Sequence, residues 1–148
     1  MKKYVLDTNI YVTAARDTSF GTELVQFVGS FLPQIYLHAV VVQELMRGAI
    51  TENARKWLAR EIVQPFEKRG RILTPGYAAW KRSGEIIADL VETRVISTGG
   101  VPGSFIQDVL LAASCREQGV TLVTLNGSDF QRIRRVSQVE YVAPWPRK

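Results

Sequence analysis

The chain has 148 residues, of which 46% are hydrophobic, so it can bury one full core, and we expect a single domain over residues 1–148. Its one cysteine, Cys115, excludes an internal disulfide and a cysteine zinc cluster, and its one histidine, His38, excludes mechanisms that need two imidazoles. No apolar run is long enough for a membrane span or resembles a signal peptide, which predicts a cytoplasmic protein without membrane contact, and the net charge of +5 favours a polyanionic partner.

The first strand of the chain is predicted to end at an acid. Residues 4–6 form an apolar run typical of a strand buried on both faces of a parallel sheet. Asp7, Thr8 and Asn9 are helix-starting residues, and residues 10–15 continue as an apolar helical segment. Ligands of open α/β sheets bind at the carboxyl ends of strands. Asp7 is therefore placed for chemistry, although it could also serve only as a helix cap.

The segment from residue 16 to residue 103 alternates helices, short strands and turns. Apolar spacing and breaking residues predict helices at residues 20–32, 51–67 and 76–95, strands at 35–37 and 72–73, and a loop at 97–103. Trp57 and Trp80 stand at helical spacing with other apolar residues. We interpret both as core or dimer contacts before base-stacking residues.

A second acid, Glu44, falls in a segment with two interpretations. Residues 39–42 could extend the preceding strand, but the run from Gln43 to Arg47 favours a helix. In a helix, Glu44 lies on the apolar side, where a glutamate needs a partner. A salt bridge to Arg47 is the structural alternative to a functional role.

A third acid, Asp108, follows a predicted helix start. Ser104 and Gln107 have the spacing of a capping box. The residues that follow are apolar nearly all round, which predicts a buried helix ending at Gly119 and places Cys115 in the core. Asp108 then lies in the first turns, where the helix dipole favours its ionisation.

The last third of the chain repeats the pattern of the N-terminus. Strands are predicted at residues 120–124 and 139–142, before a tail at 144–148. Between the strands, Asn126 is a possible helix cap and Asp129 falls in the first turn of a short helix. Capping is again the alternative to a functional role.

Together the four acids predict a metal site. Asp7 and Asp129 follow buried strands, while Glu44 and Asp108 lie on helices that a parallel sheet would pack near the same strand ends. Carboxylates gathered in one place repel one another unless cations lie between them. Oxygen ligands suit Mg²⁺ or Mn²⁺, and one or two such ions could activate water for attack on a phosphodiester.

Four motifs carry a resemblance to a known family. They are Leu6-Asp7-Thr8-Asn9, then Val42-Gln43-Glu44-Leu45, then Asp108-Val109-Leu110-Leu111-Ala112-Ala113, and finally Thr124-Leu125-Asn126-Gly127-Ser128-Asp129-Phe130. In this order they resemble the PIN-domain ribonucleases, and more narrowly the VapC toxins of toxin–antitoxin pairs. The resemblance spans nearly the whole chain, and residues 51–103 match no motif of the family closely.

The resemblance implies an α/β fold of three layers, with a mostly parallel central sheet flanked by helices. It also implies an acidic pocket that binds one or two Mg²⁺ or Mn²⁺ ions and cleaves RNA endonucleolytically, a homodimer, and an antitoxin that covers the pocket. Asp7, Glu44 and Asp108 match the three core acids of the family. Its fourth acid stands where Asn126 or Asp129 stands here, and only Asp129 is charged.

The remaining site residues are assigned around these acids. Polar support is expected from Thr8, Asn9, Thr124 and Asn126. Arg132, Arg134 and Arg135 follow Asp129 and are candidates for guiding the RNA backbone, with a solvated surface charge as the alternative for each.

Three other functions are compatible with parts of the pattern. A PIN fold could bind RNA or protein without cleaving, or it could cleave in an RNA-processing role. A phosphatase with an aspartate nucleophile also uses an acid at a strand end, but it usually needs a second aspartate two residues later, where this chain has Asn9.

Overall fold

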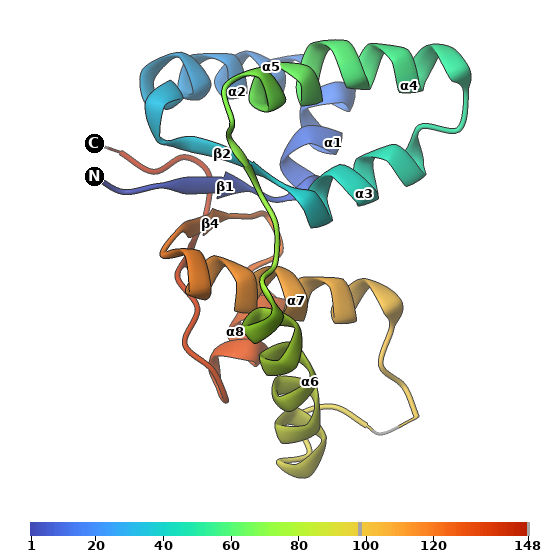
Figure 1. The fold of residues 1–148 in the computed structure, drawn as a ribbon, viewed down its shortest axis with the longest axis vertical. Helices are drawn as coiled ribbons and strands as arrows, with labels where there is room; N and C mark the ends of the chain where they lie inside the picture. Colours follow the sequence, from blue (N-terminus) through green and yellow to red (C-terminus); the bar gives the residue numbers. More distant parts are fainter. Residues whose placement is uncertain (98, 148) are drawn as a thin grey trace.

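The computed structural model describes residues 1–97 and 99–147 (Figure 1). Within these residues, five strands form one sheet in the order β3-β2-β1-β4-β5, and every neighbouring pair is parallel. The strands are β1 (Tyr4–Leu6), β2 (Ile35–His38), β3 (Ile72–Leu73), β4 (Thr121–Val123) and β5 (Tyr141–Val142). Because the strands are parallel, their carboxyl ends all lie along the same edge of the sheet.

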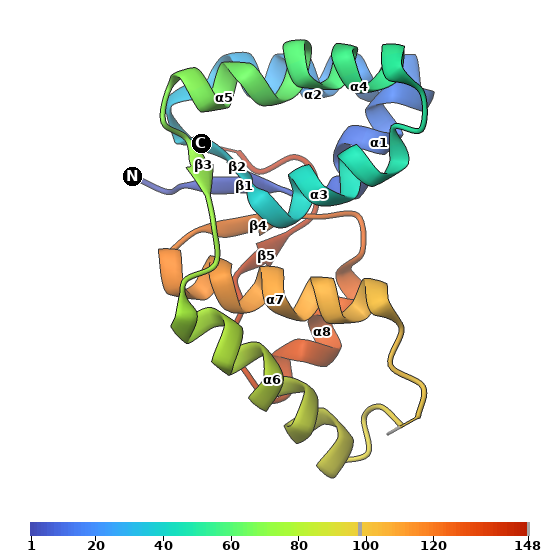
Figure 2. The ribbon, with the colours of Figure 1, turned by 45° about the vertical axis from the view of Figure 1, so that its right-hand side comes forward.

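Helices cover both faces of this sheet (Figures 1 and 2). On one side lie α1 (Thr8–Arg16), α2 (Thr18–Phe31), α4 (Glu52–Leu58) and α5 (Gln64–Lys68), and on the other lie α6 (Tyr77–Glu92), α7 (Gly103–Gln118) and α8 (Gly127–Arg134). A π-helical segment, Ala59–Val63, joins α4 to α5, and a 3-10 turn, Leu32–Gln34, follows α2. Helix α3 (Ala39–Gly48) begins where β2 ends and packs against α1 and α7. The predicted three-layer α/β architecture is confirmed.

The two faces of β1 bury different side chains. Tyr4 and Leu6 pack with Phe27 of α2 in one core, while Val5 packs with Leu111 of α7 in the other. This follows from the alternation of side chains along a strand. All three residues of β1 are buried, as the apolar run predicted.

The carboxyl edge of the sheet gathers the residues that follow its strands. Leu6 is paired with Val123, so the residue after β1 and the residue after β4 are neighbours. The backbone N–H of Asp7 donates a hydrogen bond to the Val123 carbonyl at 2.9 Å, which brings Asp7 beside Thr124. His38 ends β2 at the same edge.

The predicted capping box at the start of α7 is wrong. The helix begins at Gly103, its N-cap is Pro102, and no side chain caps it. The Gln107 amide instead donates a hydrogen bond to the Gln43 side chain of α3, at 2.7 Å. The helix itself is buried as expected, with Cys115 in the core.

Other predictions are also corrected. Trp57 and Trp80 are 51% and 58% exposed, so neither is a core residue. The last strand spans only Tyr141–Val142, whereas the helix favoured at residues 39–48 is confirmed. Thr98, in the predicted loop, lies outside the described residues. None of the helices within the described residues has the length and apolar character needed to cross a membrane.

Candidate active site

Asp7 is held by three hydrogen bonds at the end of β1. Its carboxylate accepts hydrogen bonds from the Thr8 backbone N–H at 2.8 Å, the Thr124 hydroxyl at 2.7 Å and the Asn9 amide at 3.3 Å. The side chain is only 3% exposed, and burial raises its pKa although these hydrogen bonds act in the opposite direction. Asp7 therefore caps α1 and is also a buried acid at the sheet edge.

Glu44 joins this group through Thr8. The Thr8 hydroxyl donates a hydrogen bond to the Glu44 carboxylate at 3.2 Å. Burial raises the pKa of Glu44, and so does the charge of Asp7, whereas the Thr8 hydrogen bond and the charge of Arg47 lower it. The ion pairs found among the described residues do not include Glu44 with Arg47, so the alternative of a simple salt bridge is not supported.

A second arm of the network leads from Thr124 to Asp129. The Thr124 oxygen accepts a hydrogen bond from the Asn126 backbone N–H at 2.9 Å. The Asn126 amide donates to the Asp129 carboxylate at 2.7 Å, and the Leu125 N–H donates to the Asn9 side chain at 3.2 Å. Asn126 is the N-cap residue of α8, but its side chain caps no backbone group, and its amide oxygen instead accepts a hydrogen bond from the Ser128 hydroxyl at 3.4 Å.

Asp108 faces the other acids without a partner of its own. Within the described part of the chain, its side chain takes part in no hydrogen bond or ion pair. Its pKa is raised to about 8, first by burial and then by the charges of Asp7, Asp129 and Glu44. The four predicted acids are therefore brought into one electrostatically coupled group.

The chemistry of this group suits a hard divalent cation. Its donors are carboxylate, hydroxyl and amide oxygens, and the mutual repulsion of the acids is what a cation would relieve. Among the described residues, no three His, Cys, Asp or Glu side chains are arranged as a ready-made metal cage. A site for Mg²⁺ does not need one, because this ion is usually held by one or two carboxylates together with water and substrate phosphates.

The structure gives the three candidate arginines different surroundings. Arg132 lies 3.8 Å from the Asp129 carboxylate, beside the acidic group. Arg134 donates two hydrogen bonds to the Val139 carbonyl, the shorter of 2.8 Å, so its guanidinium supports the fold. Arg135 is exposed at the end of α8.

Sequence reasoning missed a second set of polar residues near the acids. His38 is fully buried, and its Nδ1 accepts a hydrogen bond from the Val40 N–H at 3.1 Å. Its Nε2 therefore carries the proton and donates to the Ser114 hydroxyl at 2.7 Å, and burial lowers the pKa of His38 to about 4. The sequence offered a signal for these residues, because His38 directly follows a predicted strand, and Gln43 and Gln107 each directly precede a predicted acid.

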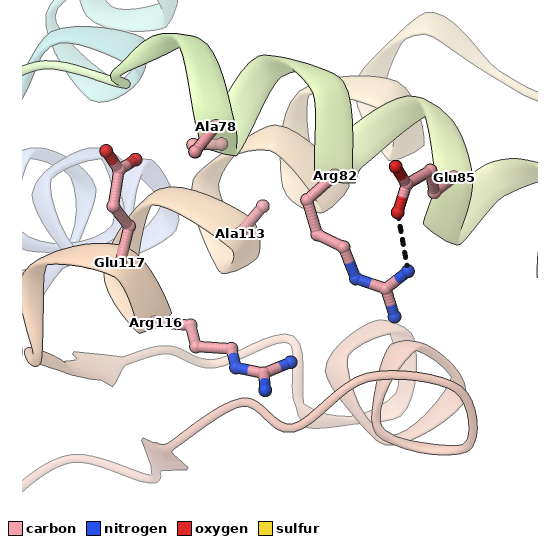
Figure 3. Close-up of a pocket in the computed structure, with 7 residues that line it drawn as sticks. Ala78, Arg82, Glu85, Ala113, Arg116 and Glu117 are labelled. Atoms are coloured by element: carbon pink, nitrogen blue, oxygen red, sulfur yellow. Dashed lines mark hydrogen bonds and ion pairs between the residues drawn. The ribbon is translucent and has the colours of Figure 1, made fainter.

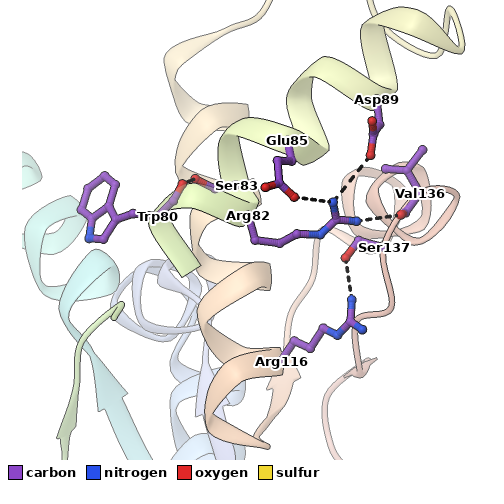
Figure 4. Close-up of polar contacts among 8 residues, drawn as sticks. All are labelled: Trp80, Arg82, Ser83, Glu85, Asp89, Arg116, Val136 and Ser137. Atoms are coloured by element: carbon purple, nitrogen blue, oxygen red, sulfur yellow. Dashed lines mark hydrogen bonds and ion pairs between the residues drawn. The ribbon is translucent and has the colours of Figure 1, made fainter. Parts of the chain in front are cut away.

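A separate hollow of about 560 Å³ lies between α6 and the second half of α7 (Figure 3). It is lined by Ala78, Ala79, Arg82, Glu85, Ala113, Arg116 and Glu117, so two cations face two anions. Arg82 pairs with Glu85 at 3.2 Å and donates to the Val136 carbonyl at 3.1 Å, while Arg116 donates to the Ser137 hydroxyl (Figure 4). These contacts tie α6 and α7 to the segment after α8, and the balanced charges do not form an anion site.

The fold and the acidic group together define an α/β protein with a carboxylate site at the carboxyl edge of a parallel sheet. A family model described as the PIN domain matches residues 4–136. The chain therefore belongs to the PIN domain family. A comparison with curated protein sequences finds no match.

Solved structures share this fold over nearly their whole length. A DNA-bound VapBC from Salmonella typhimurium is 22% identical, with a TM-score of 0.72, covering 97% of this chain and 98% of that chain. FitAcB from Neisseria gonorrhoeae is 22% identical, with a TM-score of 0.69, covering 96% and 98%. A toxin–antitoxin complex from Klebsiella pneumoniae is 19% identical, with a TM-score of 0.64, covering 97% and 98%. At these identities the likeness establishes the fold.

Proposed function

We propose that this chain is a Mg²⁺- or Mn²⁺-dependent endoribonuclease, acting in the cytoplasm as the toxin of a VapBC-type toxin–antitoxin pair. The observation that carries the proposal is the hydrogen-bonded chain from Glu44 through Asp7 to Asp129, with the unpaired Asp108 facing it. Membership of the PIN domain family, whose domains are generally nucleases, supports the activity. The net charge of +5 suits a polyanionic substrate.

Each acid has a role in this proposal. Asp7, Glu44 and Asp108 would hold the first ion, and Asp129, oriented by Asn126, would hold a second, weaker ion or its water. When bound, such ions supply an activated water and stabilise the leaving oxygen of the phosphodiester. The protein fixes the carboxylates beforehand, because Thr8 and Thr124 hold Asp7 and Glu44 in place.

RNA cleavage with and without metal tests this function. Purified protein is incubated with total RNA and Mg²⁺, Mn²⁺ or EDTA, and Glu44→Gln is compared with Glu52→Gln. Glu52 is a matched control because it is an exposed glutamate of α4 that pairs with Lys56. We expect discrete fragments from wild type and Glu52→Gln, and loss of cleavage with EDTA or Glu44→Gln. Fragments that survive both treatments would contradict the proposal.

We also propose that an antitoxin segment binds an apolar groove beside the acidic site. The groove, of about 580 Å³, lies between α1, α2, α3 and α4 and includes Tyr11, Leu24, Val25, Leu45 and Trp57, with Glu44 among its lining residues. Val25 and Trp57 remain 72% and 51% exposed. A bound apolar segment would cover these side chains and reach Glu44 at the same time, which would close the site.

Two tryptophan variants test this partner site. Trp57→Glu places a charge in the groove, and we expect it to weaken binding of the cognate antitoxin by at least about thirtyfold. Trp80→Glu is the control, since Trp80 is exposed on α6 outside the groove. Equal binding by both variants would place the partner elsewhere. The expected homodimer stays a prediction, which light scattering of the purified protein would test.

A further inference from the structure

Two neutral side chains join the helices that carry Glu44 and Asp108. The Gln107 amide of α7 donates a hydrogen bond to the Gln43 side chain of α3 at 2.7 Å. Each glutamine directly precedes one of the acids, and no other polar contact among the described residues involves either amide. The bridge therefore links the two acidic segments at the level of the acids themselves.

A second polar contact links the start of α3 to the second half of α7. His38, just before α3, donates to Ser114 of α7 at 2.7 Å inside the core. From His38 to Gln43 the chain advances about 7 Å along α3, and from Ser114 back to Gln107 it advances about 10 Å along α7. Because the two contacts are spaced along both helices, together they oppose sliding and rotation of α3 against α7.

The acids themselves act against this arrangement. Asp108 faces the charge of Glu44 as well as those of Asp7 and Asp129, so repulsion favours separation of α3 from α7. An amide bridge opposes this separation without adding charge. A lysine or arginine in its place would neutralise the carboxylates and compete with a metal ion.

We propose that Gln43 and Gln107 are positioning residues that fix Glu44 relative to Asp108 for metal binding. This inference rests on the proposed function, because it assigns the pair to the same metal site. The alternative role for the two glutamines is direct contact with RNA. In that role each side chain would act on the substrate independently of the other.

The test is a double-mutant cycle with Mn²⁺ alone. Gln43→Met, Gln107→Met and the double variant remove the amides but keep the length of the side chains, and Gln26→Met, on the exposed face of α2, is the control. Calorimetry gives the Mn²⁺ affinity of each protein. We expect each single variant to bind Mn²⁺ about three- to tenfold more weakly and the double variant to match the singles, because either change breaks the same bond.

Cleavage kinetics at saturating Mn²⁺ distinguish positioning from substrate contact. If the pair only positions the acids, excess Mn²⁺ restores kcat and leaves KM for RNA unchanged in all variants. Unchanged Mn²⁺ affinity, losses that add in the double variant, or a raised KM at saturating Mn²⁺ would each overturn the inference. Wild-type protein that binds Mn²⁺ but cuts no RNA would contradict the proposed function, while the Mn²⁺ cycle would still decide the role of the bridge.

Discussion

Replacing Asp108 with asparagine is expected to stabilise the metal-free protein. The pKa of Asp108 in the folded protein is about 8, against an ordinary value of 3.8. Below pH 3.8 the carboxyl is protonated in both folded and unfolded chains. As the pH rises from there to 8, the unfolded chain ionises first, so the folded state loses stability across this interval.

The size of this effect follows from the same interval. For a wholly buried carboxyl, the difference between pKa values of 3.8 and about 8 would correspond to about 5–6 kcal/mol of unfolding free energy. Asp108 is partly exposed, and screening by solvent reduces the expected value to about 1–3 kcal/mol. Asparagine resembles the neutral acid in shape, so Asp108→Asn should match wild type near pH 4 and exceed it by this amount at pH 8.

Urea unfolding in EDTA at pH 4, 6 and 8 measures the difference between the two proteins. We expect the gap in the free energy of unfolding to open with rising pH and to close when Mg²⁺ is added, because an ion bound to the folded state stabilises only wild type. A variant that is equally stable, or less stable, at pH 8 in EDTA would refute the idea that burial and the neighbouring acids destabilise the ionised form of Asp108.

Two further substitutions test the surroundings of the acids. Thr124→Val removes the hydroxyl that donates to Asp7 and accepts from Asn126, and should cost about 2–4 kcal/mol of unfolding free energy in urea titrations, while Thr124→Ser keeps most of it. His38→Ala leaves Ser114 and Val40 without their side-chain partner and should cost about 2–4 kcal/mol at pH 7. The pKa of His38 in the folded protein is about 4, below its ordinary value of 6.5, so wild type should lose about 3 kcal/mol of unfolding free energy as the pH falls from 6.5 to 4. The same pH-dependent loss in His38→Ala would contradict this assignment.

The acids on the sheet edge could be predicted because their positions depend on short-range patterns. Asp7 directly follows an apolar strand, and Asp129 follows another by a few residues, so parallel pairing alone brings the segments that carry them together. The polar residues Thr8 and Thr124 could be placed for the same reason, and their hydroxyls donate hydrogen bonds to Glu44 and Asp7.

Features that depend on contacts between distant segments could not be predicted. Ser104 and Gln107 have the spacing of a capping box, but the Gln107 side chain bonds to Gln43, 64 positions away in the chain, and the helix starts two residues earlier than the box predicts. Trp57 and Trp80 have helical spacing with core residues, yet each helix turns that face outward. Periodicity identifies a helix but does not show which neighbouring element covers each face.

The measurement that tests the central claim most directly follows Mn²⁺ binding and RNA cleavage in one titration, for wild type and Asp108→Asn. If the coupled acids form the active site, cleavage by wild type rises in step with Mn²⁺ bound, and Asp108→Asn loses both while remaining folded. Cleavage that proceeds before Mn²⁺ binds, or binding and cleavage that Asp108→Asn leaves unchanged, would show that the chemistry takes place elsewhere.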